Sequence, residues 1–361
     1  MRFAFFGSSL VSAYWNGAAT YYRGLLKALA DRGHRILFCE PDAFDRQAHR
    51  DIDDPPWAEV FVFAPDPAGV DAAIARARRC DVLVKFSGVG VLDRELDEAV
   101  LAARGADRTV LFWDVDAPAT LDRCAADLAD PFRRLIPRFD AVFTYGGGDA
   151  VIAAYDRLGA ELCVPIYNAL DPATHHAATA DPRFASDLAF LGNRLPDREA
   201  RVDAFFFDAA RRLPQRRFLI GGNGWRDKPM PPNVIDVGHV YTRDHNAFNS
   251  TPLAVLNVNR ESMARYGDSP PTRIFEAAGA GACIISDAWT GIEKFLLPGT
   301  EILIAEDAEE VADYVEALDP ATARRIGEAA RRRVLAEHTY ALRAAEVEAA
   351  LEGCSVLREA V

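Results

Sequence analysis

Short apolar runs alternate with stretches of helical periodicity along most of the chain. Near the start, apolar residues 2–7 precede a loop with glycine, an amphipathic stretch at 18–32 and a second apolar run at 34–40. A strand, a loop, a helix and another strand in this order form a βαβ unit, which favours a parallel sheet. Because the alternation continues to about residue 307, after which we expect helices only, we predict an α/β fold.

The pattern divides into two halves at a polar, proline-bearing run, residues 171–182, which we interpret as a linker between domains. We therefore predict one domain at 1–170 and another at 171–361, with the last helix, about 340–352, also able to cross back onto the first. The expected strands of the first half lie at 2–7, 34–40, 59–63, 81–86, 108–113, 140–145 and 161–166. Those of the second half lie at 187–191, 217–221, 233–237, 253–258 and 282–286.

Composition narrows the class of protein. The 361 residues suffice for two domains with separate cores. The net charge of -13 argues against nucleic acid or an anionic membrane as the main partner. Six scattered cysteines without a C-x-x-C pair indicate reduced thiols in a cytoplasmic protein. No segment reaches the roughly 20 apolar residues of a membrane span, so we expect no integral membrane segment.

The most informative stretch covers residues 266–299, YGDSPPTRIFEAAGAGACIISDAWTGIEKFLLPG. We predict that residues 268–272 form a turn that caps a helix, with Pro271 at its first position. Arg273 and Glu276 then lie in the first turns of that helix, which leads into a buried strand. Free helix amides beside a guanidinium suit a phosphate. A surface ion pair between Arg273 and Glu276 is the alternative.

This stretch, continued by TEILIAED and later by EHTY and Arg343, resembles the C-terminal half of glycosyltransferases of the GT-B fold. The resemblance is closest to the CgeB-like, spore-maturation-type branch. It implies two Rossmann-like parallel-sheet domains facing a central cleft, the first binding the acceptor and the second the nucleotide-sugar donor. In retaining families of this fold, two acids stand eight positions apart, which here correspond to Asp268 and Glu276. Aspartate at the first position is a departure from the family.

The resemblance also assigns roles to individual residues. Glu276 would bind the ribose hydroxyls and Asp268 the transferred sugar, while Arg273 would add charge or steady either acid. The other donor-binding candidates are Asn16 and Gly17 in the first loop, Arg194 and Arg198 for the diphosphate, Gly222 and Asn223 after a strand, and His239 and Val240 around the base. The glycines of GGNGW would also let the backbone approach a ligand closely. His239 could equally be an ordinary packed histidine.

Two further carboxylates follow the strand at 108–113, in the sequence WDVD. Asp114 and Asp116 would stand at the carboxyl end of a parallel strand, where open α/β sheets bind ligands. Asp116 could instead cap the helix that begins near residue 118. We predict no metal, because GT-B enzymes as a class do not need the Asp-x-Asp metal site found in transferases of another fold.

The sequence thus predicts a glycosyltransferase that moves a sugar from a nucleoside-diphosphate sugar to an acceptor, with retention and without a cofactor. In a retaining reaction the departing phosphate can take the acceptor's proton, whereas inversion would need a base such as Asp114 or Asp116. The acceptor could be a carbohydrate, a lipid-linked molecule, another small molecule or a protein. The alternatives are a sugar-nucleotide epimerase of the same fold and a non-catalytic binding protein. The missing G-x-G-x-x-G disfavours a nicotinamide dehydrogenase.

Overall fold

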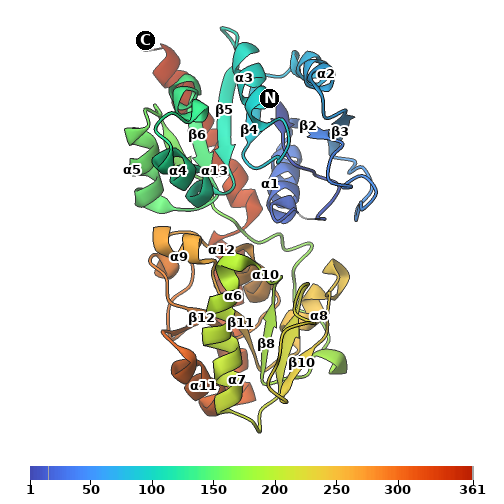
Figure 1. Cartoon of the computed structure of the whole chain (residues 1–361), viewed down its shortest axis with the longest axis vertical. Coiled ribbons are helices and arrows are strands. Elements are labelled where there is room, and N and C mark those ends of the chain that lie inside the picture. The colour runs from blue at the N-terminus through green and yellow to red at the C-terminus, as the bar shows by residue number, and fades with distance from the viewer. Residues whose placement is uncertain (15, 360–361) are drawn as a thin grey trace. The chain divides into compact units, whose positions relative to one another are not determined.

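The computed structural model describes residues 1–14 and 16–359, with side chains through residue 354. The chain forms two compact units. Unit 1 comprises Met1–Asn168 and Tyr340–Val361, and unit 2 comprises Ala169–Thr339. The predicted alternation of strands and helices is confirmed in both units (Figure 1).

Unit 1 is built on a seven-stranded parallel sheet with the order β3-β2-β1-β4-β5-β6-β7. Its strands are β1 Arg2–Phe6, β2 Arg35–Pro41, β3 Ala58–Phe63, β4 Val82–Phe86, β5 Thr109–Asp114, β6 Ala141–Thr144 and β7 Cys163–Pro165. The four central strands β1, β4, β5 and β6 are almost entirely buried, which explains their continuous apolar runs. The chain order reverses between β1 and β4, so the loops that follow these strands flank the switch point of this sheet.

Six helices accompany this sheet: α1 Ala19–Asp31, α2 Pro67–Ala77, α3 Asp93–Ala102, α4 Ala117–Ala126, α5 Gly148–Arg157 and α13 Tyr340–Glu359. The last helix, red in Figure 1, packs against α1 of the same unit. Gly24 permits this close contact, because a Cβ atom there would lie 2.2 Å from the Tyr340 ring. The C-terminal helix is therefore part of unit 1.

Unit 2 repeats the architecture with six parallel strands in the order β10-β9-β8-β11-β12-β13. The strands are β8 Leu188–Leu191, β9 Phe218–Gly221, β10 Val234–Asp236, β11 Ala254–Asn257, β12 Ile284–Asp287 and β13 Leu303–Ala305. Here the chain order reverses between β8 and β11, which pair in register through Leu188–Ala254 and Phe190–Leu256. The loops after β8 and β11 therefore flank the switch point of this sheet.

The helices of unit 2 enclose a core rich in phenylalanine. They are α6 Pro196–Val202, a π-helical segment Asp203–Phe207, α7 Asp208–Arg212, α8 His245–Ser250, α9 Glu261–Tyr266, α10 Thr272–Gly279, α11 Ala308–Ala317 and α12 Pro320–Glu337. Phe206, in the π-helical segment, packs edge-on against Phe218 of β9. This contact fixes the connection between α6 and α7 on the sheet.

Two local predictions differ from the structure. Pro271 is the N-cap residue of α10 rather than its first helical residue, and it makes no side-chain capping hydrogen bond. The expected capping groups are used elsewhere, since Asp268 pairs with Lys294 and the Ser269 hydroxyl donates to the Gly267 carbonyl. Residues 171–182 also pack within unit 2, where the His176 amide donates to Asn246.

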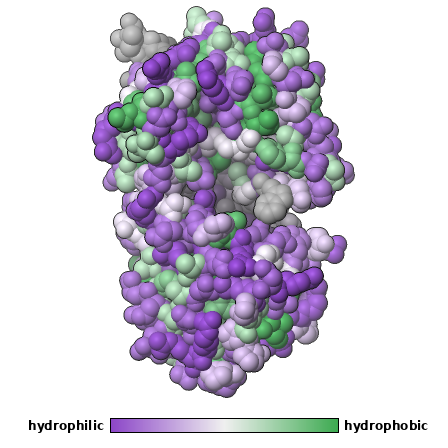
Figure 2. Space-filling view, in the orientation of Figure 1, coloured by the Kyte–Doolittle hydropathy of each residue, from purple (hydrophilic) through white to green (hydrophobic). Residues whose placement is uncertain are grey.

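Hydrophilic residues predominate on the face of the molecule shown in Figure 2. None of the described helices is long and apolar enough to cross a membrane. The six cysteines form no disulfide, and Cys39, Cys124, Cys283 and Cys354 are buried. Burial raises the pKa of the Cys283 thiol to about 12, so this sulfur remains protonated and packs as an apolar group.

Candidate functional site

Two arginines meet at the switch point of the second sheet. Arg198 lies on α6 and Arg273 lies in the first turn of α10. A Cβ atom on Gly192, directly after β8, would lie 2.9 Å from Nη2 of Arg273 and 3.0 Å from Nη1 of Arg198. Glycine at this position leaves the space into which both guanidinium groups reach. The structure thus brings together two positive charges from different helices at one strand end.

Arg273 has no carboxylate partner within ion-pair distance among the described residues. Its Nη1 contacts the Asn257 amide oxygen at 3.4 Å, and its guanidinium lies 5.3 Å from the centre of the Phe190 ring. Burial, reinforced by the charge of Arg198, lowers the pKa of Arg273 to about 9. The positive charge is therefore poorly compensated in the free protein, and an anion at this point would stabilise it.

Glu276 follows Arg273 by about one helical turn on α10. Its Oε1 lies 3.7 Å from Nε2 of His175, which is buried, and a ligand atom of His245 completes a cluster whose members all lie within 4.8 Å of one another. Gly279 lets the segment carrying His175 approach α10, because a Cβ atom there would lie 2.9 Å from the His175 carbonyl oxygen. The two histidines come from a loop and from the start of α8, and no sequence spacing links them to Glu276.

The candidates after β9 and β10 line the same edge of the sheet. Gly222 has a φ of +124°, and a Cβ atom there would lie 2.3 Å from the Gly192 carbonyl oxygen. Gly222 therefore allows two strand ends to pack together, which only glycine permits. Asn223 and His239 are exposed and contact each other at 3.4 Å, whereas Val240 is buried. His239 is thus not a packed core histidine.

Arg194 is engaged by carboxylates, although it lies shortly after the end of β8. Its Nη2 donates to Glu199 at 2.8 Å, and its Nη1 lies 3.3 Å from Asp227. Lys228 also pairs with Glu199, at 2.7 Å. The charge of Arg194 is therefore neutralised by carboxylates in the described structure, while that of Arg273 is not.

Asp268 occupies a strained turn before α10. Its φ is +43°, an uncommon conformation for a residue other than glycine. The carboxylate reaches Lys294 at 2.7 Å and covers Gly291, where a Cβ atom would lie 2.0 Å from Oδ1 of Asp268. Backbone strain of this kind concentrates at functional sites. The turn holds one carboxylate and one ammonium group beside the start of α10.

The remaining donor candidates, Asn16 and Gly17, belong to the loop between β1 and α1 in unit 1. The Asn16 amide is fully used inside this loop, because it accepts from Ser8 and donates to the carbonyls of Ser9 and Ser12. Asn16 therefore shapes the loop. Gly17 is exposed, and a Cβ atom there would meet nothing within 4 Å.

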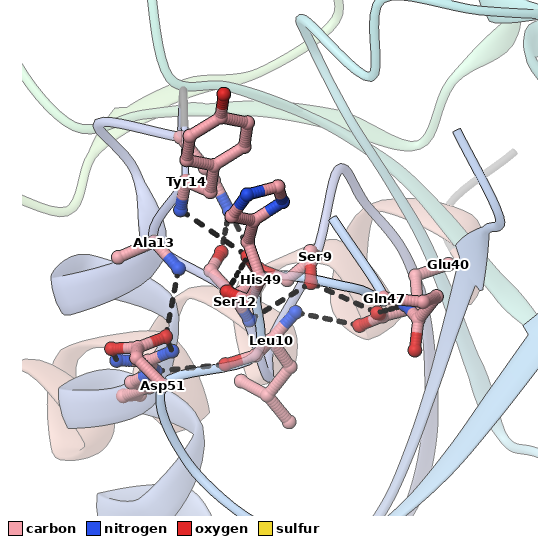
Figure 3. A network of polar contacts seen from close by, with 11 residues as sticks. Ser9, Leu10, Ser12, Ala13, Tyr14, Glu40, Gln47, His49 and Asp51 are labelled. Atoms are coloured by element: carbon pink, nitrogen blue, oxygen red, sulfur yellow. Dashed lines mark hydrogen bonds and ion pairs between the residues drawn. The ribbon is translucent and has the colours of Figure 1, made fainter. Parts of the chain in front are cut away.

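A buried carboxylate, Glu40, holds the same loop through hydrogen bonds to Ser9 and Leu10 (Figure 3). One oxygen accepts from the Ser9 hydroxyl at 2.8 Å and from Gln47 at 2.6 Å, and the other accepts from the Leu10 amide at 2.7 Å. Charge-assisted hydrogen bonds of this kind are about twice as strong as neutral ones. They keep the loop after β1 in one conformation.

Asp114 and Asp116 stand at the carboxyl end of β5 as predicted. Asp114 is fully buried and accepts from Ser87 at 2.7 Å, from the Tyr155 hydroxyl and from the Asp116 amide. Burial raises the pKa of Asp114. These contacts make Asp114 a structural group. Asp116 occupies the N-cap position of α4, but its side chain makes no capping hydrogen bond.

Comparison with known proteins places this geometry in context. Residues 198–349 match the family described as "Glycosyl transferase-like", so the matched segment begins within α6 and ends within α13. It contains Arg198, Arg273 and Glu276. No curated protein matches the chain in sequence.

Several solved structures share the whole fold. Anabaena HepE, in complex with UDP and glucose, superposes with a TM-score of 0.67 at 14% identity over 98% of this chain and 100% of that one. Sucrose-phosphate synthase from Thermosynechococcus elongatus has a TM-score of 0.72 at 14% identity, over 99% of this chain and 100% of that one. T4 phage BGT, in complex with its substrate UDP-glucose, has a TM-score of 0.63 at 12% identity, over 98% of this chain and 99% of that one. These likenesses establish the GT-B fold, with two Rossmann-like parallel-sheet domains.

Proposed function

We propose that this protein is a glycosyltransferase that binds a nucleoside-diphosphate sugar in unit 2 and transfers the sugar to an acceptor bound by unit 1. The observation that carries the proposal is the convergence of Arg198 and Arg273 on Gly192. Two guanidinium groups at a sheet switch point, one of them without a carboxylate partner in the described structure, suit a diphosphate. The residue pattern quoted above further suggests the CgeB-like branch.

The two arginines would act on the leaving group. Breaking the bond between the sugar and the diphosphate leaves growing negative charge on the departing oxygens, and fixed cations stabilise that charge most in the transition state. Loss of one such donor typically costs about 3 to 4 kcal/mol. Arg194, engaged by Glu199 and Asp227, would contribute less than Arg198 and Arg273.

Asp268 and Lys294 would meet the transferred sugar. A carboxylate can accept hydrogen bonds from sugar hydroxyls, and the ammonium group can hold that carboxylate in place. We propose a retaining reaction in which the departing phosphate takes the acceptor's proton, without a metal. The hydrogen bonds that occupy Asp114 support this choice, because they leave it poorly suited to be a general base. The anomeric configuration of the product, read by NMR, tests it.

The nucleotide would extend along the carboxyl edge of the second sheet. Glu276 would bind the ribose, and the exposed His239 with the backbone of Val240 would frame the base. Asn223 and Gly222 lie beside them. HepE and T4 phage BGT were solved with UDP or UDP-glucose, so uridine diphosphate is the first ligand to test. Asn16, through the loop it shapes, and Gly17 would border the acceptor in unit 1.

Calorimetric titration with UDP and UDP-glucose tests the assignment. We expect binding by the native protein and a loss of about 100-fold in affinity in Arg198→Ala and Glu276→Ala. Arg211→Ala is the matched control, because Arg211 is 55% exposed and pairs only with Asp208 in the described structure. Native-like affinity in both site variants would contradict the proposal. Turnover that requires an acceptor would separate a transferase from an epimerase.

A further inference from the structure

We infer that His175 and His245 complete, with Glu276, a polar site for the vicinal ribose diol of the nucleotide. The inference rests on the proposed function and adds two residues to it. Both histidines would contact the ligand directly and would select ribonucleotides over deoxyribonucleotides.

The hydrogen bonds of His245 fix its tautomer. Its Nε2 lies 3.2 Å from the Val240 carbonyl oxygen, which can only accept, so Nε2 carries the hydrogen. In the neutral ring, Nδ1 then has a free lone pair. This atom is buried and has no hydrogen-bond partner among the described residues. Burial also lowers the pKa of His245, so the ring stays neutral near pH 7.

His175 lies close to Glu276 without a hydrogen bond between them. Its Nδ1 is 3.0 Å from the Thr174 hydroxyl, which also reaches the Asp171 carbonyl at 3.2 Å. Its Nε2 lies 3.7 Å from Oε1 of Glu276, which is too long for a hydrogen bond. A hydroxyl group placed beside these two atoms could therefore contact both.

The cluster therefore presents the Glu276 carboxylate and Nδ1 of His245 as acceptors beside Nε2 of His175. All three ligand atoms lie within 4.8 Å of one another, and an unsatisfied buried acceptor costs about 1 to 3 kcal/mol. A vicinal diol supplies two hydroxyl donors about 3 Å apart, which would satisfy acceptors at this spacing. A ribose in this place would follow the diphosphate naturally, since Glu276 lies about one helical turn beyond Arg273.

A divalent cation is the other species that such a cluster could hold, since two histidines and a carboxylate can ligate zinc. The surrounding charge disfavours it. Arg273 acts electrostatically on His245 and on Glu276, and Arg198 acts on Arg273, while the cluster has a single carboxylate. A dication would be repelled by two nearby guanidinium groups. A nucleoside diphosphate is attracted by the same guanidinium groups, because its diol is neutral and its diphosphate is anionic.

Binding of UDP and of 2′-deoxy-UDP, measured by calorimetry at pH 7.5, tests the inference. We expect the native protein to prefer UDP by about tenfold, and His175→Ala and His245→Ala to reduce that preference to about twofold. His175→Gln should restore part of the preference, because an amide group can replace the ring nitrogen as a hydrogen-bond partner. His176→Ala is the matched control, because His176 is exposed and contacts Ala177 and Asn246 instead of Glu276.

Each outcome has a separate meaning. If UDP and its deoxy analogue bind equally to the native protein, or if the histidine variants keep the native preference, the inference fails while the proposed function stands. If neither nucleotide binds, both fail. Dialysis against zinc chloride is the last arm: stoichiometric zinc retained by the native protein and lost from His245→Ala would assign the cluster to a metal and overturn the inference.

The preference should also fall as the pH decreases. Protonation of His245 replaces its Nδ1 acceptor with a donor, and the charged groups that face His245 are Glu276, His175 and Arg273. We expect the ratio of UDP to 2′-deoxy-UDP affinity to decline between pH 7.5 and pH 5.5 in the native protein. The same affinity ratio should not change with pH in the double variant His175→Ala with His245→Ala. An equal decline in both proteins would contradict the role of the histidines.

Discussion

Replacing Arg273 with methionine should stabilise the free protein and weaken its affinity for nucleotides. Burial and the charge of Arg198 lower the pKa of Arg273 to about 9, and each unit of such a shift corresponds to about 1.36 kcal/mol of unfavourable interaction for the charged form. Solvent reaches part of the side chain, and replacing buried charges with apolar groups gains about 1 to 4 kcal/mol. We expect the free energy of unfolding to rise by about 1 to 2 kcal/mol.

Urea denaturation of the free protein and calorimetry with UDP measure the two effects. The same substitution should weaken UDP binding by about 100-fold or more, because the cation that meets the diphosphate is gone. Gain of stability together with loss of affinity marks a residue held for a ligand. A structural arginine would not show this combination.

Arg201→Met is the matched comparison within the same unit. Arg201 donates to the fully buried Asp287 at 2.7 Å and also pairs with Glu261 at 3.0 Å. Its removal leaves a buried carboxylate unpaired, which destabilises by about 3 to 5 kcal/mol. The two variants should therefore change stability in opposite directions. If Arg273→Met lowers the free energy of unfolding as Arg201→Met does, Arg273 is a structural cation and the reasoning fails.

Three further predictions concern other parts of the molecule. Asp268→Asn should slow sugar transfer by about tenfold while UDP affinity measured by calorimetry stays within twofold, and a parallel loss of UDP affinity would contradict its role at the sugar. Glu40→Ala should lower the free energy of unfolding by about 2 to 3 kcal/mol in urea, because the Ser9 hydroxyl and the Leu10 amide lose their acceptor, whereas Glu40→Gln should lose less. Burial raises the pKa of Asp97 from 3.8 to about 6, so the folded protein keeps a proton that the unfolded chain releases, and this contribution lowers stability as the pH rises from 4 to 6. Asp97→Asn should remove this decrease in stability between pH 4 and pH 6, and Lys85 keeps Asp93 as a partner at 2.8 Å. An unchanged pH dependence of stability in the variant would refute the role of Asp97.

The sequence predicted the fold well because its signals are local. Buried parallel strands appear as short apolar runs, and the amphipathic stretches between them match the helices of the structure. The two-sheet architecture and the start of α10 near Arg273 follow from such patterns. The capping of α10 was predicted wrongly, since a sequence does not show that Asp268 turns toward Lys294.

The candidate site was less accessible, because its members meet through tertiary contacts. The convergence of Arg198 and Arg273 depends on the space at Gly192, and the pairing of Arg194 with Glu199 and Asp227 depends on how two loops fold together. His175 lies in a segment expected to be an interdomain linker. Its approach to Glu276 requires Gly279 in the facing helix. These contacts could not be predicted from the spacing of the residues along the chain.

Determining the structure of the protein with UDP bound tests the central claim most directly. The account predicts diphosphate oxygens in contact with the guanidinium groups of Arg198 and Arg273 beside Gly192, with the ribose hydroxyls at Glu276. A diphosphate held by other residues, with both of these guanidinium groups unoccupied, would contradict it.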